Sequence, residues 1–313
     1  MVGFTAAVVQ AAPVAFDVAR TLVKLGDLAA DAARQGAKIA VFPEAFVSAY
    51  PKGLDFGARL GSRTPEGREM FRRYFESAID VPGPATDQIG RIAKANGLQL
   101  VVGVIERELG TLYCTALFFG PDGQCQGKHR KLMPTAMERL IWGFGDGSTL
   151  PVIETPLGRV GAVICWENYM PLLRTAMYAK GVELYCAPTV DCRRTWAPSM
   201  RHIAIEGRCF VLSACQFARR SDFPADYPCD IKPLSDADND GVLIDGGSVI
   251  VDPLGEILAG PHYDGERILT AEIDRGAIAR GKYDLDVVGH YARPDVFQLH
   301  VDERAKASVV RET

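Results

Sequence analysis

A cysteine at position 165 ends a short apolar run and is followed at once by polar side chains. Residues 160–164 are aliphatic and β-branched, which is typical of a buried strand. Glu167 and Asn168 come next, and Pro171 begins a stretch with the apolar spacing of a helix. A strand-to-helix turn lifts a nucleophile above the sheet and aims backbone N–H groups at a developing anion. We therefore interpret Cys165 as a catalytic thiol, with a buried structural cysteine as the alternative.

A catalytic thiol needs a partner, because cysteine attacks as the thiolate and is mostly protonated near neutral pH. None of the five histidines stands in a local signature of a cysteine protease. A carboxylate can replace histidine if burial raises its pKa. Glu44 follows the apolar run 39–42, and Lys131 follows a predicted strand that ends near His129. These positions favour Glu44 as a general base and Lys131 as a cation that stabilises developing negative charge.

The elements that must position these residues alternate between strand and helix in the first and middle parts of the chain. Strands are predicted over 5–10, 38–42, 98–105, 113–119, 124–129, 160–164, 182–187, 209–214, 246–251, 256–258 and 267–273. Helices are predicted over 17–35, 86–96, 171–180, 196–206 and 275–281. The mixture indicates an α/β protein with paired sheets covered by helices on their outer faces.

The rest of the chain is predicted to be less regular. Residues 47–79 read as an insertion of loop and short helix, and residues 221–240 as a solvated loop rich in Pro and Asp. An extended tail is expected from about residue 286. No linker or repeat divides the sequence, so we predict a single domain over residues 1–313.

Composition argues against several classes of protein. The 313 residues are 48% hydrophobic and 24% charged, which is ordinary for a soluble globular chain. The net charge of −4 and the lack of a basic tract argue against nucleic-acid binding. No apolar run reaches the length of a membrane span and no signal peptide is visible, so a cytoplasmic location is expected. The eight cysteines form no Cys-x-x-Cys pair, which favours free thiols and no metal site.

Three segments give the sequence a resemblance to the nitrilase superfamily of carbon–nitrogen hydrolases, over nearly the whole chain. Residues 42–46 (FPEAF) resemble the segment that carries the family's glutamate base. Residues 129–134 (HRKLMP) resemble its lysine segment, and residues 165–171 (CWENYMP) its nucleophile segment. The residues after the cysteine, together with 185–189 (YCAPT) and 289–295 (GHYARPD), are typical of the true nitrilases.

This resemblance implies a fold, an activity and an assembly. The fold would be a four-layer α-β-β-α sandwich, and the reaction would convert an organic nitrile to a carboxylic acid and ammonia without a cofactor. Glu138 matches the family's second glutamate, which would hold Lys131 or orient substrate; a structural ion pair is the alternative. The chain would form a dimer or larger homo-oligomer, extended in some members into spirals or filaments. The helix 171–180 and the tail after residue 286 are the expected contacts.

Aromatic residues close in sequence to these segments are candidates for binding substrate. Tyr50, Trp142, Trp166, Tyr169 and Trp196 could build a pocket for aryl or arylalkyl nitriles, with core packing as the alternative. The Trp166 backbone N–H is also a candidate oxyanion donor. Aliphatic nitriles and cyanide remain open as substrates. The competing functions are an amidase or N-carbamoylase on the same scaffold, a non-catalytic oligomerising scaffold and a redox sensor.

Overall fold

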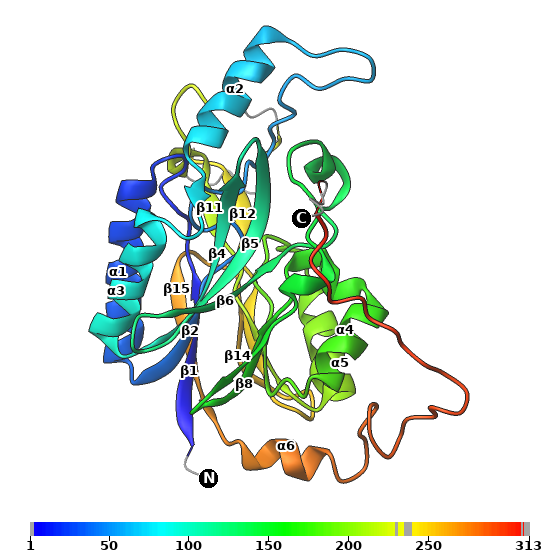
Figure 1. Cartoon of the computed structure of the whole chain (residues 1–313). Helices are drawn as coiled ribbons and strands as arrows, with labels where there is room; N and C mark the ends of the chain where they lie inside the picture. The colour runs from blue at the N-terminus through cyan, green and yellow to red at the C-terminus, as the bar shows by residue number, and fades with distance from the viewer. Residues whose placement is uncertain (1–2, 229–230, 235–239, 308, 310–313) are drawn as a thin grey trace.

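The computed structural model describes residues 3–228, 231–234, 240–307 and 309, and in it two β-sheets pack face to face between two layers of helices (Figure 1). The first sheet has the strand order β15-β1-β2-β4-β5-β6, and β3 pairs with β4. Its strands are β1 (Phe4–Gln10), β2 (Ala37–Val41), β3 (Ile79–Asp80), β4 (Gln99–Glu108), β5 (Thr111–Phe119), β6 (Cys125–Arg130) and β15 (Arg267–Ile273).

The second sheet has the strand order β14-β13-β10-β9-β8-β7. Its strands are β7 (Val152–Thr155), β8 (Gly158–Ala162), β9 (Leu184–Cys186), β10 (Phe210–Ser213), β13 (Ser248–Val251) and β14 (Ile257–His262). A separate two-stranded ribbon joins β11 (Phe217–Arg219) to β12 (Val242–Asp245). In both main sheets the central strands run parallel, β1 with β2 and β4, and β8 with β9 and β10.

The outer layers are two pairs of helices. The pair α1 (Val18–Arg34) and α3 (Pro84–Asn96) covers the first sheet, and the pair α4 (Pro171–Ala179) and α5 (Trp196–Gly207) covers the second (Figure 1). The predicted start of α1 is confirmed, because the Asp17 side chain accepts a hydrogen bond from the Arg20 N–H at 2.9 Å. None of the described helices has both the length and the apolar character needed to cross a membrane.

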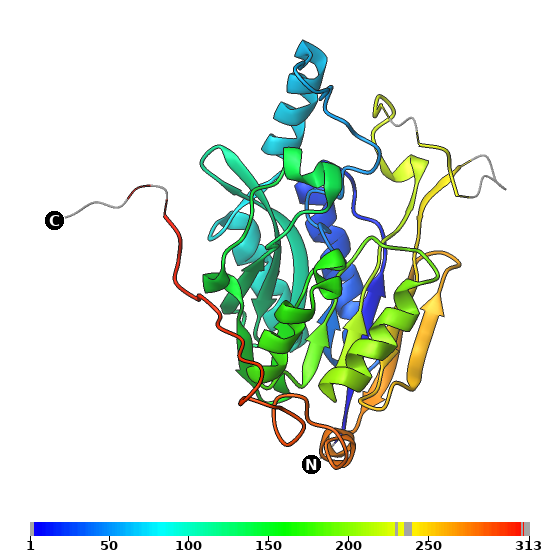
Figure 2. The same ribbon diagram turned by 90° about the vertical axis from the view of Figure 1, so that its right-hand side faces the viewer.

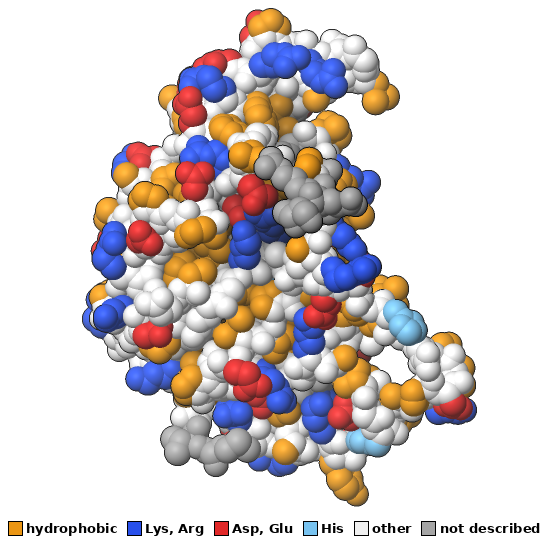
Figure 3. All heavy atoms as spheres, in the orientation of Figure 1, with side chains coloured by type: hydrophobic (Ala, Val, Ile, Leu, Met, Phe, Trp, Pro, Cys, Tyr) orange, Lys and Arg blue, Asp and Glu red, His pale blue; other side chains and the backbone are white. Residues whose placement is uncertain are grey.

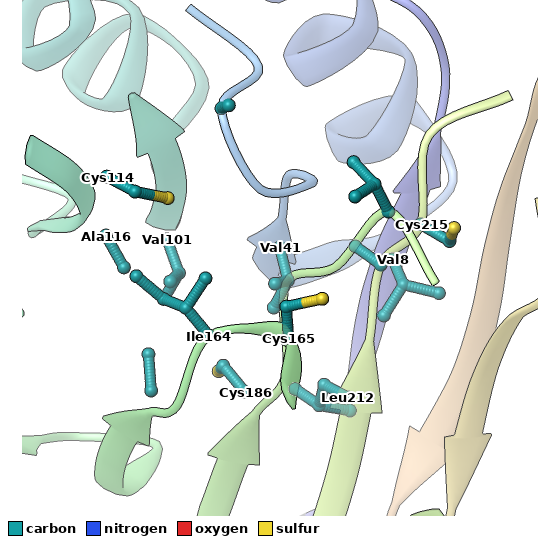
Figure 4. Close-up of a cluster of buried hydrophobic side chains, with 14 of the residues drawn as sticks. Val8, Val41, Val101, Cys114, Ala116, Ile164, Cys165, Cys186, Leu212 and Cys215 are labelled. Carbon is teal, nitrogen blue, oxygen red and sulfur yellow. The ribbon is translucent and has the colours of Figure 1, made fainter. Parts of the chain in front are cut away.

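The alternation of side chains along the strands divides the core into three layers. In β1, Ala6 and Val8 face the second sheet, whereas Ala7 and Val9 face the helices α1 and α3. The cluster between the sheets includes Cys165, whose side chain lies among residues from strands of both sheets (Figure 4). A residue at the end of a strand therefore reaches the region where the two sheets meet.

The α/β class and the four-layer arrangement predicted above are confirmed, and the local differences lie outside the central strands. Strand β7 was not predicted, although it pairs with β8 in a hairpin. The insertion at 47–79 contains a helix of 12 residues, α2 (Pro65–Glu76), which projects at the top of Figure 1. Basic side chains, drawn in blue, gather over this upper part of the molecule in Figure 3. The predicted loop 221–240 falls partly outside the described residues.

The end of the chain is extended. After α6 (Gly276–Gly281) the described residues form turns and irregular backbone, and the tail runs upward along the side of the second sheet (Figures 1 and 2). Lys180 Nζ lies 2.9 Å from Glu303 Oε1, and the Lys306 N–H donates to Asp146 Oδ2 at 2.7 Å. These contacts hold part of the tail against the body of the molecule.

Candidate active site

Cys165 occupies a constrained turn directly after strand β8. It is the first residue of a short 3₁₀ helix, η3 (Cys165–Tyr169), and its φ of +50° lies in the left-handed region. The Cys165 N–H donates to Pro188 O at 2.9 Å, and Asn168 Nδ2 donates to Cys165 O at 2.7 Å. The predicted turn is thus followed by this 3₁₀ helix before α4 begins, and the backbone hydrogen bonds hold the strained residue in place.

Lys131 lies between two carboxylates. Its Nζ is 2.7 Å from Glu44 Oε1 and 2.8 Å from Glu138 Oε2, and its side chain has no solvent exposure. The Tyr50 hydroxyl donates to the other oxygen of Glu138, Oε1, at 2.8 Å. Lys131 also lies 5.4 Å from the ring centre of Trp142. The structure therefore brings together Glu44, Lys131 and Glu138, with one of the predicted aromatic residues bound directly to Glu138.

Glu44 is fully buried at the end of strand β2, and its backbone is fixed by Gln216, whose Nε2 donates to Glu44 O at 2.8 Å. Burial raises the pKa of Glu44 above the ordinary value, although the charge of Lys131 and a hydrogen bond from the Cys165 thiol act in the opposite direction. Glu44 Oε2 has no hydrogen-bond donor within ordinary distance among the described residues. One oxygen of this carboxylate is therefore open to accept a proton.

The Cys165 thiol is protonated at rest. Burial and the charge of Glu44 raise the pKa of Cys165 far above its ordinary value, and the charge of Lys131 only partly opposes them. The Thr189 hydroxyl donates to Cys165 Sγ at 3.2 Å. A raised thiol pKa disfavours the thiolate, and a nearby base such as Glu44 would help to form it.

Lys131 remains a cation despite its burial. Desolvation alone would lower the pKa of Lys131, but the charge of Glu44, together with that of Glu138, raises it well above the ordinary value. A buried ammonium is a strong electrostatic partner for negative charge that develops during a reaction. Its position suits the role predicted from the sequence.

Two adjoining cavities reach Glu138, and one of them reaches Cys165; Glu44 and Lys131 are not among their lining residues. A cavity of about 210 Å³ is lined by Cys165, Glu138, Tyr50, Trp166 and six further residues. A more apolar cavity of about 280 Å³ shares Tyr50 and Glu138 and adds the side chains of Leu54, Phe56, Ile141 and Trp142. A larger surface hollow of about 560 Å³ contains none of the predicted site residues.

The predicted aromatic residues are thus divided between pocket and packing. Tyr50, Trp142 and Trp166 line one or both cavities. Tyr169 does not line either one and instead packs edge-on against Trp166 and Trp196, each with ring centres 5.9 Å apart. Trp196 is the first residue of α5 and is buried in the core, where its Nε1 donates to Ser213 Oγ at 2.9 Å. Tyr169 therefore packs against the ring of Trp166 and does not line the cavities.

Some polar residues around the site were not singled out from the sequence. Asp191 Oδ2 accepts a hydrogen bond from Trp166 Nε1 at 2.8 Å, and the Arg193 guanidinium stacks on the Trp166 ring at 4.7 Å. Buried His129 binds buried Glu167. Glu167 carried a visible signal, since it is a charged residue two positions after the nucleophile, whereas the positions of Asp191 and Arg193 depend on tertiary packing.

No resident metal is indicated within the described part of the chain. No group of three or more His, Cys, Asp or Glu side chains there is arranged to hold a metal ion. The seven cysteines in the described residues are all free. The chemistry that this arrangement supports is nucleophilic attack by sulfur, with a carboxylate base and an ammonium beside it.

Comparisons with known proteins agree with this geometry. Residues 5–283 match the carbon–nitrogen hydrolase family. An aliphatic nitrilase of Sinorhizobium fredii (strain HH103) is 61% identical over 310 residues, covering 99% of each chain. A bifunctional nitrilase/nitrile hydratase of Nicotiana tabacum is 56% identical, over 97% of this chain and 87% of that protein. A Saccharomyces cerevisiae protein from branch 10 of the nitrilase superfamily shares the fold, with a TM-score of 0.70 and 22% identity over 92% of this chain and 96% of its own. The chain belongs to the carbon–nitrogen hydrolase family, within its nitrilase branch.

Proposed function

We propose that this protein hydrolyses an organic nitrile to the carboxylic acid and ammonia, with Cys165 as nucleophile. The observation that carries the proposal is the buried Glu44–Lys131–Glu138 chain, whose Glu138 lines the same cavity as Cys165. The relatives named above are nitrilases, which supports the same substrate class for this chain.

The first half of the reaction forms a covalent thioimidate. Glu44 takes the thiol proton, the sulfur of Cys165 bonds to the nitrile carbon, and Glu44 passes the same proton to the nitrogen. Lys131 and the backbone N–H of Trp166 stabilise the negative charge that develops on nitrogen. Glu138, through its contact with Lys131, holds the ammonium group toward the nitrile nitrogen.

The second half consumes two water molecules. Glu44 removes a proton from the first water, which adds to the thioimidate carbon, and the resulting tetrahedral species expels ammonia to leave a thioester. A second water cleaves the thioester and restores the thiol. Expulsion of the Cys165 sulfur in place of ammonia would instead release an amide, the product of a nitrile hydratase. The tobacco relative is named a bifunctional nitrilase/nitrile hydratase.

The adjoining cavity supports an apolar substituent on the nitrile. Its lining of Leu54, Phe56, Ile141, Trp142 and Tyr50 is aliphatic and aromatic. A volume of about 280 Å³ fits a small substituent of either kind. We propose nitriles with an aryl, arylalkyl or short alkyl group as substrates.

A panel of nitriles tests this function. The panel should include phenylacetonitrile, benzonitrile, a short alkyl nitrile and cyanide, together with the matching amides and an N-carbamoyl amino acid. Released ammonia and the acid-to-amide ratio are measured for the wild type and for Cys165→Ala. We expect turnover of one or more organic nitriles by the wild type only. Turnover confined to the amides or the carbamoyl compound would replace the proposal with an amidase or carbamoylase.

We further propose that copies of the chain associate, and that the protein works in the cytoplasm. Hydrophobic side chains on the tail project into solvent, including Tyr291, Phe297 and Val296, and this part of the molecule protrudes at the lower right of Figure 3. Exposure of this kind on an extended segment supports contact with a second copy. The free thiols of the described cysteines support a reducing compartment.

A further inference from the structure

A buried ion pair lies behind the candidate active site and joins the two sheets. His129 Nε2 is 2.9 Å from Glu167 Oε2, and neither side chain has solvent exposure. His129 belongs to β6 in the first sheet, and Glu167 lies in η3, which follows β8 of the second sheet. Burying two such groups is costly unless each is fully hydrogen-bonded, so their remaining contacts indicate what they do.

The carboxylate of Glu167 binds the backbone next to both reacting side chains. Glu167 Oε2 accepts from the Ile164 N–H at 2.9 Å, one residue before Cys165. Glu167 Oε1 accepts from the Leu132 N–H at 2.6 Å, one residue after Lys131. A single carboxylate therefore fixes the segment that carries the nucleophile to the segment that carries the ammonium.

His129 supplies the positive charge that this carboxylate needs. Its Nδ1 lies 2.6 Å from Thr149 O, a carbonyl that can only accept, and its Nε2 faces the Glu167 carboxylate. Both ring nitrogens therefore carry hydrogen, and the ring is an imidazolium. Burial and the charge of Lys131 lower the pKa of His129, but Glu167 and the hydrogen bond to the Thr149 carbonyl together raise it, and the net shift is upward.

We propose that Glu167 and His129 are positioning residues that set the distance between Lys131 and Cys165 across the two sheets. Neither group is placed to touch the reacting atoms. Their effect reaches the chemistry through the backbone of Ile164 and Leu132, because an error of about 1 Å in such a site can cost about 10²-fold in rate. One of the two measurements that follow, the rate of nitrile hydrolysis, rests on the proposed function.

The test replaces Glu167 by Gln and uses Glu106→Gln as the matched control. Glu106 is an equally buried carboxylate paired with Lys128 and Arg130, on either side of His129 in β6, but its hydrogen bonds do not reach the segment of Cys165. Glu167 accepts three hydrogen bonds, from the Ile164 N–H, the Leu132 N–H and His129 Nε2. In E167Q one carboxylate oxygen becomes an NH₂ group, which cannot accept, so at least one of these bonds must break. For E167Q we expect kcat to fall about 10- to 100-fold with little change in KM. For E106Q we expect kcat to stay within about threefold of the wild type.

The second readout needs no nitrile. The rate at which iodoacetamide alkylates Cys165 is measured against pH for each variant, and the melting temperature is recorded in parallel. Displacement of Lys131 should slow alkylation in E167Q near neutral pH and move its pH profile upward, while E106Q follows the wild type. Equal alkylation profiles for E167Q and the wild type would overturn the proposal. If the wild type turned over no nitrile, the proposed function would fail while this profile still tested the positioning role.

His129→Gln covers the case in which E167Q does not fold. Gln can donate one hydrogen bond to Glu167 but carries no charge, so the two backbone contacts of Glu167 remain while their electrostatic support is lost. We expect about a 10-fold slower alkylation of Cys165, with the melting temperature lowered to a similar extent as in E106Q. Alkylation at the wild-type rate in H129Q would also contradict the proposal.

Discussion

At the scale of single residues, the candidate site combines a buried thiol with a buried carboxylate. Cys165 is 4% exposed, and burial together with the nearby Glu44 raises the pKa of its thiol. Glu44 has the complementary property, a carboxylate whose own pKa is raised by burial and which has an oxygen without a donor. In the mechanism that we propose, proton transfer between these two groups allows the sulfur to attack a substrate.

The candidate site residues could be singled out from the sequence because each follows an apolar strand. Glu44 and Cys165 are polar or reactive side chains at the ends of hydrophobic runs, where a buried polar group calls for an explanation. The bond between Tyr50 and Glu138 and the pairing of His129 with Glu167 could not be predicted in the same way. These residues are separated by 88 and 38 positions, and only the packing of the sheets determines that they meet.

Removing the nucleophile should abolish turnover and leave the fold intact. We expect Cys165→Ala to lower nitrile hydrolysis by roughly 10⁴-fold or more, since loss of a nucleophile removes the covalent pathway. Ammonia release measures the activity, and circular dichroism with thermal unfolding measures the fold. A folded variant with undiminished activity would exclude Cys165 as the nucleophile.

The acid limb of the pH profile should report on Glu44. Glu44 must be ionised to accept the thiol proton, so kcat/KM falls as the pH drops through the pKa of Glu44, which is raised above 4.5. We expect the midpoint of this limb above that value in a plot of kcat/KM against pH. Glu44→Gln should lower kcat/KM by about 10²- to 10⁴-fold at every pH and remove the limb. An acid midpoint at or below 4.5 would argue that another group acts as the base.

At the scale of elements, close backbone contacts aim the site residues. Gly103 in β4 packs against the turn that carries Glu44, and a Cβ atom at this position would lie 2.1 Å from Pro43 O and 2.8 Å from Glu44 Cα. The central strands were predictable from their apolar, β-branched runs. Strand β7 was missed because its partly exposed residues, Val152–Thr155, carry a weak pattern. The conformation of η3 depends on two hydrogen bonds of the Cys165 backbone, a tertiary one to Pro188 O and a local one from Asn168 Nδ2. Hydrophobic periodicity in the sequence does not reveal such bonds.

Gly103→Ala should therefore disturb both stability and activity. The added methyl group meets backbone atoms that cannot rotate away, so we expect a loss of about 1–3 kcal/mol in the free energy of unfolding. We also expect a larger fractional loss of kcat than of stability, because the displaced backbone carries the base. Denaturant unfolding and nitrile turnover are measured together. Gly110→Ala is the control, since a Cβ atom there meets nothing within 4 Å; equal behaviour of the two variants would contradict the argument.

At the scale of the whole molecule, the tail leaves hydrophobic side chains without cover. Phe297 is 79% exposed and Tyr291 is 67% exposed, although other residues of the tail contact the body of the chain. The sequence resemblance predicts contacts between copies in this region. Neither residue periodicity nor the structure of one chain indicates how many copies assemble, because that number depends on angles set by the partner.

Charged substitutions on the tail should weaken association between copies. Burial of one Phe side chain contributes about 1.5–3 kcal/mol, so Phe297→Asp should raise the dissociation constant by about 10-fold or more. Light scattering after size-exclusion chromatography, over a range of protein concentrations, measures the change. Gln298→Asp adds the same charge at the neighbouring exposed position and serves as the control. An unchanged mass distribution for Phe297→Asp would place the interface elsewhere.

The distribution of the reacting groups over two sheets has a consequence for folding. Glu44 and Lys131 are carried by one layer, and Cys165 by the other. Neither half of the polypeptide can assemble the proton-transfer pair by itself, so hydrolytic competence arises only when the layers dock. Catalytic activity should therefore indicate that the two sheets have packed together. During refolding, we expect activity to return when the side chains between the sheets become buried, and not when helices and strands first form.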